Sequence, residues 1–185
     1  MTLLVFLSFV SFFGYIFTNR RKSRYSFKTF LDSYINVMPV FVIPYVLLYP
    51  LVVYSYLSLS GITLDLYLIA IFLANIIATV FWYLFPNGVV RGRLNGSSIF
   101  SRVINYIYSV DGDTNGFPSG HVFLSVISCY FLYASSNNLL YIVLALLISV
   151  STVFTKQHYV VDIIGGLVVA GISIAGSGIL MSHFS

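Results

Sequence analysis

Two short segments carry the side chains in this sequence that are best suited to chemistry, and both lie at the edges of long apolar runs. The first reads FPSGH at 117–121 and the second reads KQHYVVD at 156–162. Imidazole, ammonium and carboxylate groups are costly near lipid, so their presence there indicates function. His158 and Asp162 are four residues apart and share one helix face. Such a pair can hold an imidazole in one tautomer, as a nucleophile requires.

The first segment has the pattern of a helix start that binds an anion. Pro118 suits the first turn of a helix, and Ser119 is a natural cap. The backbone N–H groups of Ser119, Gly120 and His121 would then point at a shared anion site. Gly120 would also allow the backbone to approach closely.

Three cations accompany the two histidines. Lys156 precedes His158 by two residues, and Arg91 and Arg93 lie in the polar stretch before His121. Cations, a helix N-terminus and two imidazoles together are typical of a phosphoryl-transfer site. His121 and His158 meet at one membrane face if the chain has six spans.

The composition predicts the structural class. Of the 185 residues, 59% are hydrophobic and 8% are charged, and none is Glu. Soluble domains carry about 25% charged residues, so the chain is expected to be an all-α integral membrane protein with a bundle of six transmembrane helices. The net charge of +4 does not indicate a nucleic-acid partner, because the cations are few and are separated by apolar runs. We expect them to meet lipid headgroups or a phosphorylated substrate.

A single membrane domain is expected over residues 1–185, since no internal repeat or linker is visible. The polar stretch at about 86–118 is the longest non-apolar segment and is treated as a functional loop. The first span lacks a basic leader and a small-residue cleavage site, so it is interpreted as an anchor. The expected spans, each of roughly 20 residues, are about 2–18, 34–59, 63–85, 119–135, 138–155 and 159–182.

One segment resembles a calcium loop only in part. Asp111–Gly116 matches the first half of an EF-hand, but the twelfth position is Val122 instead of the bidentate Glu. We therefore expect no metal site and no cofactor. The segment is interpreted as a turn-rich approach to the next helix, with Asp113 or Asn115 available to a headgroup or an arginine.

At these residues the chain resembles the type 2 phosphatidic acid phosphatase superfamily, which includes the vanadium haloperoxidases. Its motifs are K-x6-R-P, P-S-G-H and S-R-x5-H-x3-D. Residues 118–121 match the second motif in full, and residues 151–162 match the third except that Thr152 replaces Arg. In the first motif, Arg91 is followed by Gly92, and Leu84 stands where Lys is expected.

The residues around these motifs look more like the inositol phosphorylceramide synthase branch. They are Phe-Pro at 85–86 and Thr-Lys-Gln-His-Tyr at 155–159. The resemblance implies a phosphatase core at about 30–182, within a multi-pass protein of the cell membrane.

The resemblance also implies a role for each site residue. His158 would attack phosphorus and form a phosphohistidine, and Asp162 would orient it. His121 would protonate the leaving alkoxide and then activate water. Stabilisation of the phosphoryl oxygens would fall to Arg91, Lys156, Ser119 and Gly120, with Arg93 as a local substitute. No metal is required.

Three function classes remain open at this stage. The first is a phosphatase acting on a lipid phosphomonoester or pyrophosphate, and the second is a phosphotransferase in which an alcohol replaces water. The third is a non-enzymatic membrane protein or transporter, which the intact His121, His158 and Asp162 disfavour. The small-xxx-small pairs in the sixth span serve packing within one chain or between chains, so they do not decide the oligomeric state.

Charge asymmetry predicts the orientation. Five Lys and Arg residues follow the first span at 20–28, and the opposite side of a six-span chain, including residues 60–62 and 136–138, has none. The positive-inside rule then favours an active site at the cytoplasmic face. The family resemblance implies the opposite orientation, since many relatives act at the outer or lumenal face, and we expect the charge rule to prevail.

Overall fold

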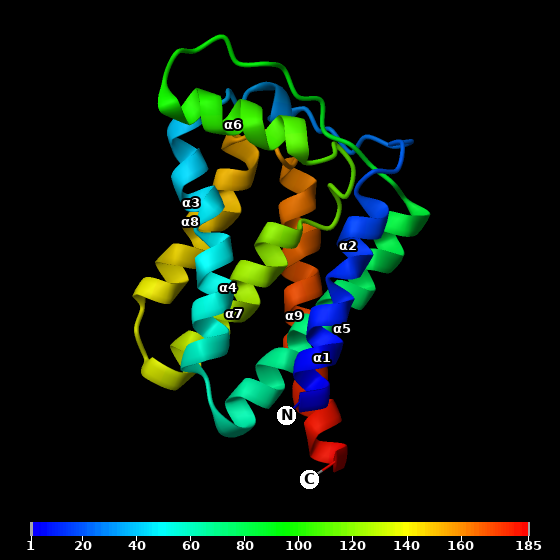
Figure 1. Cartoon of the computed structure of the whole chain (residues 1–185), viewed down its shortest axis with the longest axis vertical. Helices are drawn as coiled ribbons and strands as arrows, with labels where there is room; N and C mark the ends of the chain where they lie inside the picture. Colours follow the sequence, from blue (N-terminus) through cyan, green and yellow to red (C-terminus); the bar gives the residue numbers. More distant parts are fainter. Residues whose placement is uncertain (1, 185) are drawn as a thin grey trace.

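The computed structural model describes residues 2–184, and within them the chain forms helices and no β-strand. One isolated bridge joins Tyr25 and Asn87. Most helices run roughly along the long axis of the molecule, α5 (Gly61–Leu84) crosses the bundle obliquely, and α6, Ile99–Val110, lies across one end (Figure 1). The prediction of an all-α fold is therefore confirmed.

Four long helices form most of the bundle. They are α5 (Gly61–Leu84), α7 (Gly120–Ser136), α8 (Leu140–Phe154) and α9 (Val160–Phe184). The N-terminal apolar segment comprises α1 (Thr2–Ser11) and α2 (Phe13–Thr18), which meet at Phe12. Each of these elements lies within about two residues of a span expected from the sequence.

The second apolar segment begins later than expected. A short 3-10 turn, η1 (Leu31–Ser33), precedes it, and the segment itself runs as η2 (Pro39–Phe41), α3 (Val42–Val46) and α4 (Leu48–Ser58). Met38 is extended, as is usual before proline, so the helix starts at Pro39 and not at residue 34. The prolines explain both the late start and the division of the segment into short helices.

Among residues 2–184, three helical segments are long and apolar enough to cross a membrane. They are Pro39–Ser58, Gly61–Leu84 and Val160–His183. The other apolar helices, Leu4–Thr18, Gly120–Ser136 and Leu140–Phe154, are shorter. By length and composition, the three longer segments are compatible with membrane spans.

Helix α6 corrects the expectation that residues 86–118 form a loop. Ser98 caps it, since its Oγ accepts a hydrogen bond from the Ser101 N–H at 3.1 Å. Within α6, the side chain of Ile104 is fully buried, while those of Ile99 and Val110 are exposed. Its length and apolar content are below those of a span, which is why a search for spans overlooks it.

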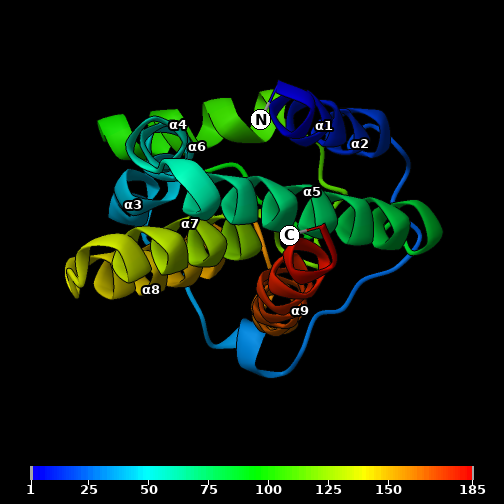
Figure 2. The same ribbon diagram turned by 90° about the horizontal axis from the view of Figure 1, so that it is seen from below.

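Helix α5 is central to the packing. It contacts α1 and α2 on one side and α9 on the other, and it also contacts α7 (Figure 2). Helix α9 approaches α7 closely at Gly166, where an added Cβ would lie 2.7 Å from the Cβ of Val122. Trp82 of α5 is buried and donates from Nε1 to the Pro118 carbonyl at 3.1 Å. These contacts fix the start of α7.

Both ends of the chain lie at the same end of the bundle, opposite to α6 (Figure 1). The segments at the α6 end are 19–38, 85–119 and 155–159. They contain all nine Lys and Arg residues of the sequence, namely Arg20, Arg21, Lys22, Arg24, Lys28, Arg91, Arg93, Arg102 and Lys156. The positive charge is therefore concentrated at one end.

Candidate active site

The two sequence segments meet at the α6 end of the bundle. His121 is in the first turn of α7 and His158 is in the turn between α8 and α9, and their ring centres are 6.3 Å apart. Both line a small cavity of about 20 Å³. The other residues that line it are Arg91, Gly120, Tyr15, Tyr45, Asp111, Thr114, Asn115 and Gln157.

The tautomer of His158 follows from its hydrogen bond. Its Nδ1 lies 2.8 Å from the carbonyl oxygen of Gly116. A carbonyl oxygen can only accept, so Nδ1 carries the proton and donates it. In the neutral imidazole, Nε2 then carries the free lone pair that a nucleophile needs.

Asp162 lies behind His158. Its Oδ2 is 3.6 Å from His158 Nδ1, longer than a hydrogen bond, and accepts the Tyr159 N–H at 2.8 Å. The residue is fully buried. The Asp162 backbone carbonyl also accepts the Ser119 N–H at 3.1 Å. Asp162 therefore supplies negative charge beside the imidazole and ties the two motifs together, while Gly116 supplies the direct hydrogen bond.

Asn87 holds the Gly116 carbonyl in place. The Asn87 side-chain oxygen accepts the Phe117 N–H at 2.8 Å, and its backbone carbonyl accepts the Gly116 N–H at 3.3 Å. A Cβ on Gly116 would lie 2.6 Å from Asn87 Nδ2 and 3.3 Å from Asp162 Oδ2. The sequence alone did not identify Asn87 or Gly116 as site residues, although Asn87 directly follows the Phe-Pro pair at 85–86.

Aromatic rings hold His121. Its imidazole stacks on the ring of Tyr45, with ring centres 3.9 Å apart. The ring of Tyr49 is nearly perpendicular to it, with ring centres 6.0 Å apart. Its Nε2 is buried and has no hydrogen-bond partner among residues 2–184. The second imidazole thus has an unused nitrogen in the cavity that His158 also lines.

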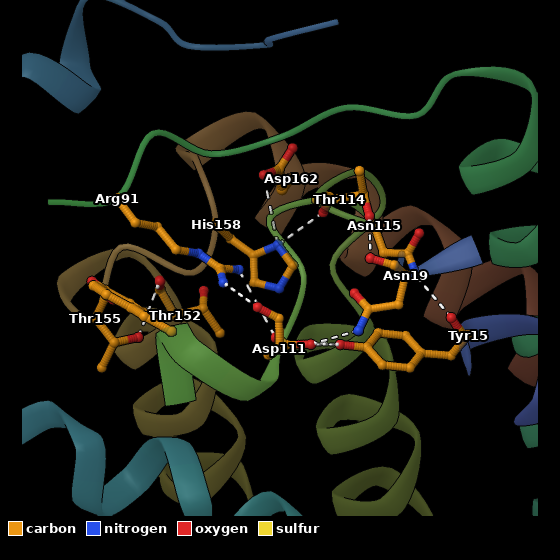
Figure 3. A network of polar contacts seen from close by, with 12 residues as sticks. Tyr15, Asn19, Arg91, Asp111, Thr114, Asn115, Thr152, Thr155, His158 and Asp162 are labelled. Carbon is orange, nitrogen blue, oxygen red and sulfur yellow. Dashed lines mark hydrogen bonds and ion pairs between the residues drawn. The ribbon is translucent and has the colours of Figure 1, made fainter. Parts of the chain in front are cut away.

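Arg91 is held by Asp111 at the same cavity. Its guanidinium lies 3.9 Å from the Asp111 carboxylate and donates to the Asp111 carbonyl at 3.2 Å. Asp111 in turn accepts from Tyr15 at 2.5 Å and from Asn19 at 2.9 Å, so it lies between Arg91 and these two residues (Figure 3). Sequence reasoning had offered Asp113 or Asn115 as the partner of an arginine, whereas the structure has Asp111 in that position.

Three of the residues predicted for the anion site do not line this cavity. The Lys156 ammonium donates to the backbone carbonyl of Asp32 at 3.0 Å, and Lys156 and Arg93 line a different cavity. Ser119 is fully buried, and its N–H is bonded to Asp162. The cavity thus brings together His121, His158, Arg91 and Gly120 from the predicted set.

Thr152 occupies the position where the third motif has Arg. It is fully buried, and its hydroxyl donates to the Ser149 carbonyl at 2.7 Å. Its own carbonyl accepts the N–H groups of Gln157 and His158 at 2.9 and 3.1 Å. At this position the chain therefore fixes the backbone of His158 and contributes no cation.

Asp32 is a further residue that sequence reasoning missed. It is buried, and its carboxylate accepts hydrogen bonds from the Thr29 N–H and hydroxyl, each at 2.7 Å, and from the Val160 N–H at 2.9 Å. Asp32 thereby connects the segment after α2 (residues 19–38) by hydrogen bonds to Val160, the first residue of α9, which lies two positions beyond His158. A single Asp in a polar loop gives no sequence signal for this role.

The arrangement has the parts that phosphoryl transfer uses. One imidazole has a free lone pair, a second imidazole has an unused nitrogen, and a guanidinium and the first turn of α7 offer donors to an anion. The sequence profile of the PAP2 superfamily matches residues 5–176. No curated protein and no solved structure gave a match. The match begins within α1 and covers all three motif regions, and the chain belongs to the PAP2 superfamily.

Proposed function

We propose that the chain is a membrane-embedded lipid phosphate phosphatase that hydrolyses a lipid phosphomonoester or pyrophosphate through a phosphohistidine. The observation that carries this proposal is the 2.8 Å hydrogen bond from His158 Nδ1 to Gly116. It leaves the Nε2 lone pair of His158 free in a cavity shared with His121 and Arg91. Membership of the PAP2 superfamily supports the same reaction class.

The reaction proceeds in two displacements. His158 Nε2 attacks phosphorus, the bond to the leaving oxygen breaks, and His121 gives a proton to that oxygen. A water then loses its proton to His121 and attacks the phosphohistidine, which releases inorganic phosphate and restores His158. Arg91 and the N–H groups at Gly120 stabilise the charge on the phosphoryl oxygens, and Asp162 stabilises the positive imidazole.

Entry of the substrate requires the cavity to open. About 20 Å³ holds roughly one water molecule. Arg91 and Asp111 also line a much larger cavity of about 860 Å³ between the segment after α5 and helix α6. We infer that the phosphoryl group reaches His158 from this larger cavity when Asp111 moves away from Arg91.

We propose six transmembrane spans in the cell membrane, with the site at the cytoplasmic face. The apolar helical segments and the position of both chain ends support an even number of crossings. The nine Lys and Arg residues at the α6 end support the orientation. Single cysteines at Ser26 and Ser182, in a Cys129→Ala background, should react with an impermeant thiol reagent on intact cells only at position 182. Labelling at position 26 alone would reverse the orientation.

A lipid phosphotransferase, like the inositol phosphorylceramide synthases, is the second candidate. The large cavity beside Arg91 favours it, because Asn105, Tyr106, Tyr108 and Ser109 line that cavity with groups that bind an alcohol. In that case the hydroxyl of an acceptor takes the place of water in the second displacement.

Purified protein in detergent tests these functions. We expect free phosphate from phosphatidate or isoprenyl pyrophosphate, and none from the His158→Ala variant. Transfer to inositol or to ceramide without phosphate release would favour the transferase. No turnover with any of these substrates would contradict both and favour a non-enzymatic protein.

A further inference from the structure

A third cavity at the α6 end is lined by cations that the proposed reaction does not use. It has a volume of about 430 Å³. It lies between the basic segment that follows α2 (residues 19–38), the segment after α5 and the turn between α8 and α9. Lys28, Arg93 and Lys156 line it, one from each segment. Three chain segments that are distant in sequence thus bring positive charge to one place.

Within residues 2–184, none of these three side chains forms an ion pair with a carboxylate, and Asp32 is the one acidic residue that lines the cavity beside them. The two carboxylate oxygens of Asp32 are engaged by Thr29 and Val160. Lys156 bonds to the backbone carbonyl of Asp32 instead of its carboxylate. The cavity therefore keeps an excess of positive charge.

Two of these cations, Lys28 and Lys156, are close enough for one to affect the other. Burial lowers the pKa of Lys156, the charge of Asp32 raises it, and the charge of Lys28 lowers it again. Like charges gathered in a cavity are unfavourable unless an anion binds between them, and phosphate oxygens accept charge-assisted hydrogen bonds from both Lys and Arg.

The backbone of Lys156 also points to a use for its side chain. Lys156 has a φ of +50°, in the left-handed region that residues other than glycine rarely adopt. It follows the C-terminal end of α8, where glycine is the usual residue. Lysine in this conformation has a cost that glycine would avoid. This cost indicates a functional role for the Lys156 ammonium group.

We propose that the cavity of Lys28, Arg93 and Lys156 binds a second phosphate group, distinct from the one that reacts at His158. The group is either the headgroup phosphate of an anionic lipid or inorganic phosphate. The cavity shares Val90 and Arg93 with the 860 Å³ cavity, which in turn shares Arg91 and Asp111 with the cavity of the two histidines. A phosphate bound here is therefore adjacent to the route by which substrate or product would pass.

Calorimetric titration of the full chain in neutral detergent tests this binding. The background carries Arg91→Gln and His158→Ala, so that the probes are neither turned over nor held at the histidines. The probes are inorganic phosphate and dihexanoylphosphatidate. We expect Lys156→Gly or Lys28→Gln to weaken binding about 10-fold or more, as expected for loss of a charge-assisted hydrogen bond.

Two controls separate a specific site from general charge and from misfolding. Arg20→Gln combined with Lys22→Gln removes two positive charges from the segment 19–38, one more than either cavity variant, without altering a residue that lines the cavity. Affinity should nevertheless change less than about 2-fold. Lys156→Gly relieves the left-handed strain but also removes the hydrogen bond to the Asp32 carbonyl, so the melting temperature should change little while binding weakens.

Each outcome has a defined meaning. Binding of both probes, of the lipid alone or of inorganic phosphate alone supports the site and identifies the source of the group. The proposal is overturned if neither probe binds, if the cavity variants bind as well as the background, or if the control loses as much affinity. Phosphate release by the unmodified protein is measured separately, so failure of the proposed function would leave this result unaffected.

Discussion

Replacing Asp32 with asparagine should lower both the stability of the chain and the rate of its reaction. Oδ2 of Asp32 accepts two hydrogen bonds from Thr29, and Oδ1 accepts one from the Val160 N–H. An amide has the same shape but only one oxygen, so its NH2 group must face an N–H or O–H donor. Because this side chain is only 2% exposed, water cannot compensate for the lost acceptor.

The size of the effect can be worked out from these contacts. Hydrogen bonds to a charged group contribute about 1.5–3 kcal/mol each, and bonds that share a partner are not additive. Loss of one side of the carboxylate should therefore cost about 3 kcal/mol. At roughly 2–4 °C per kcal/mol for a chain of this size, the melting temperature should fall by about 6–12 °C.

Thermal unfolding in detergent and phosphate release measure the two consequences. Asp113→Asn is the matched control, since it makes the same change at an exposed side chain. Thr29→Val removes only the hydroxyl bond and should have a smaller effect. The maximal rate should fall in Asp32→Asn more than in Thr29→Val, because only the first disturbs Val160, two residues from His158. An unchanged melting temperature in Asp32→Asn would refute this role for the carboxylate.

Three further predictions concern the cavity of the two histidines. His158→Ala should abolish turnover while the protein remains folded, and His121→Ala should reduce the rate by about 10²–10⁴-fold, as measured by phosphate release. Gly116→Ala should destabilise the protein by about 1–3 kcal/mol in thermal unfolding, because its Cβ would lie 2.6 Å from Asn87 Nδ2. An unchanged stability would show that Asn87 moves away from the added methyl group without cost. Vanadate, which adopts the five-coordinate geometry of the reacting phosphoryl group, should compete with substrate, whereas EDTA should leave the rate unchanged, since residues 2–184 contain no cluster of three His, Cys, Asp or Glu side chains. Loss of activity with EDTA that a divalent cation restores would contradict the two-histidine mechanism.

Much of the fold was accessible from the sequence because apolar length is a strong signal. The expected third, fourth, fifth and sixth spans each agree with a helix to within about two residues. Pro39 shows the limit of that signal, since residues 34–38 are apolar enough to extend a span, but Met38 is extended directly before the proline and the helix begins only at Pro39. Helix α6 was missed because its apolar residues lie on one side, so its average composition is that of a loop.

The site was accessible only in part because motifs report side chains and not the directions in which they lie. The two histidines were expected to meet, and they line one cavity. Lys156 is two residues from His158 in sequence, but the left-handed turn at Lys156 takes its side chain to Asp32. The partner of His158 Nδ1 is a backbone carbonyl, at Gly116, which no pattern of side-chain types can indicate.

Trp82 gives the molecule an intrinsic optical reporter. It is the single tryptophan in the sequence, it is buried, and its indole N–H donates to the Pro118 carbonyl directly before the helix that carries His121. Its ring is also nearly perpendicular to that of Tyr15, with ring centres 5.5 Å apart, and Tyr15 lines the cavity of the two histidines. Fluorescence from one unlabelled chromophore can therefore follow the opening and filling of this cavity in real time.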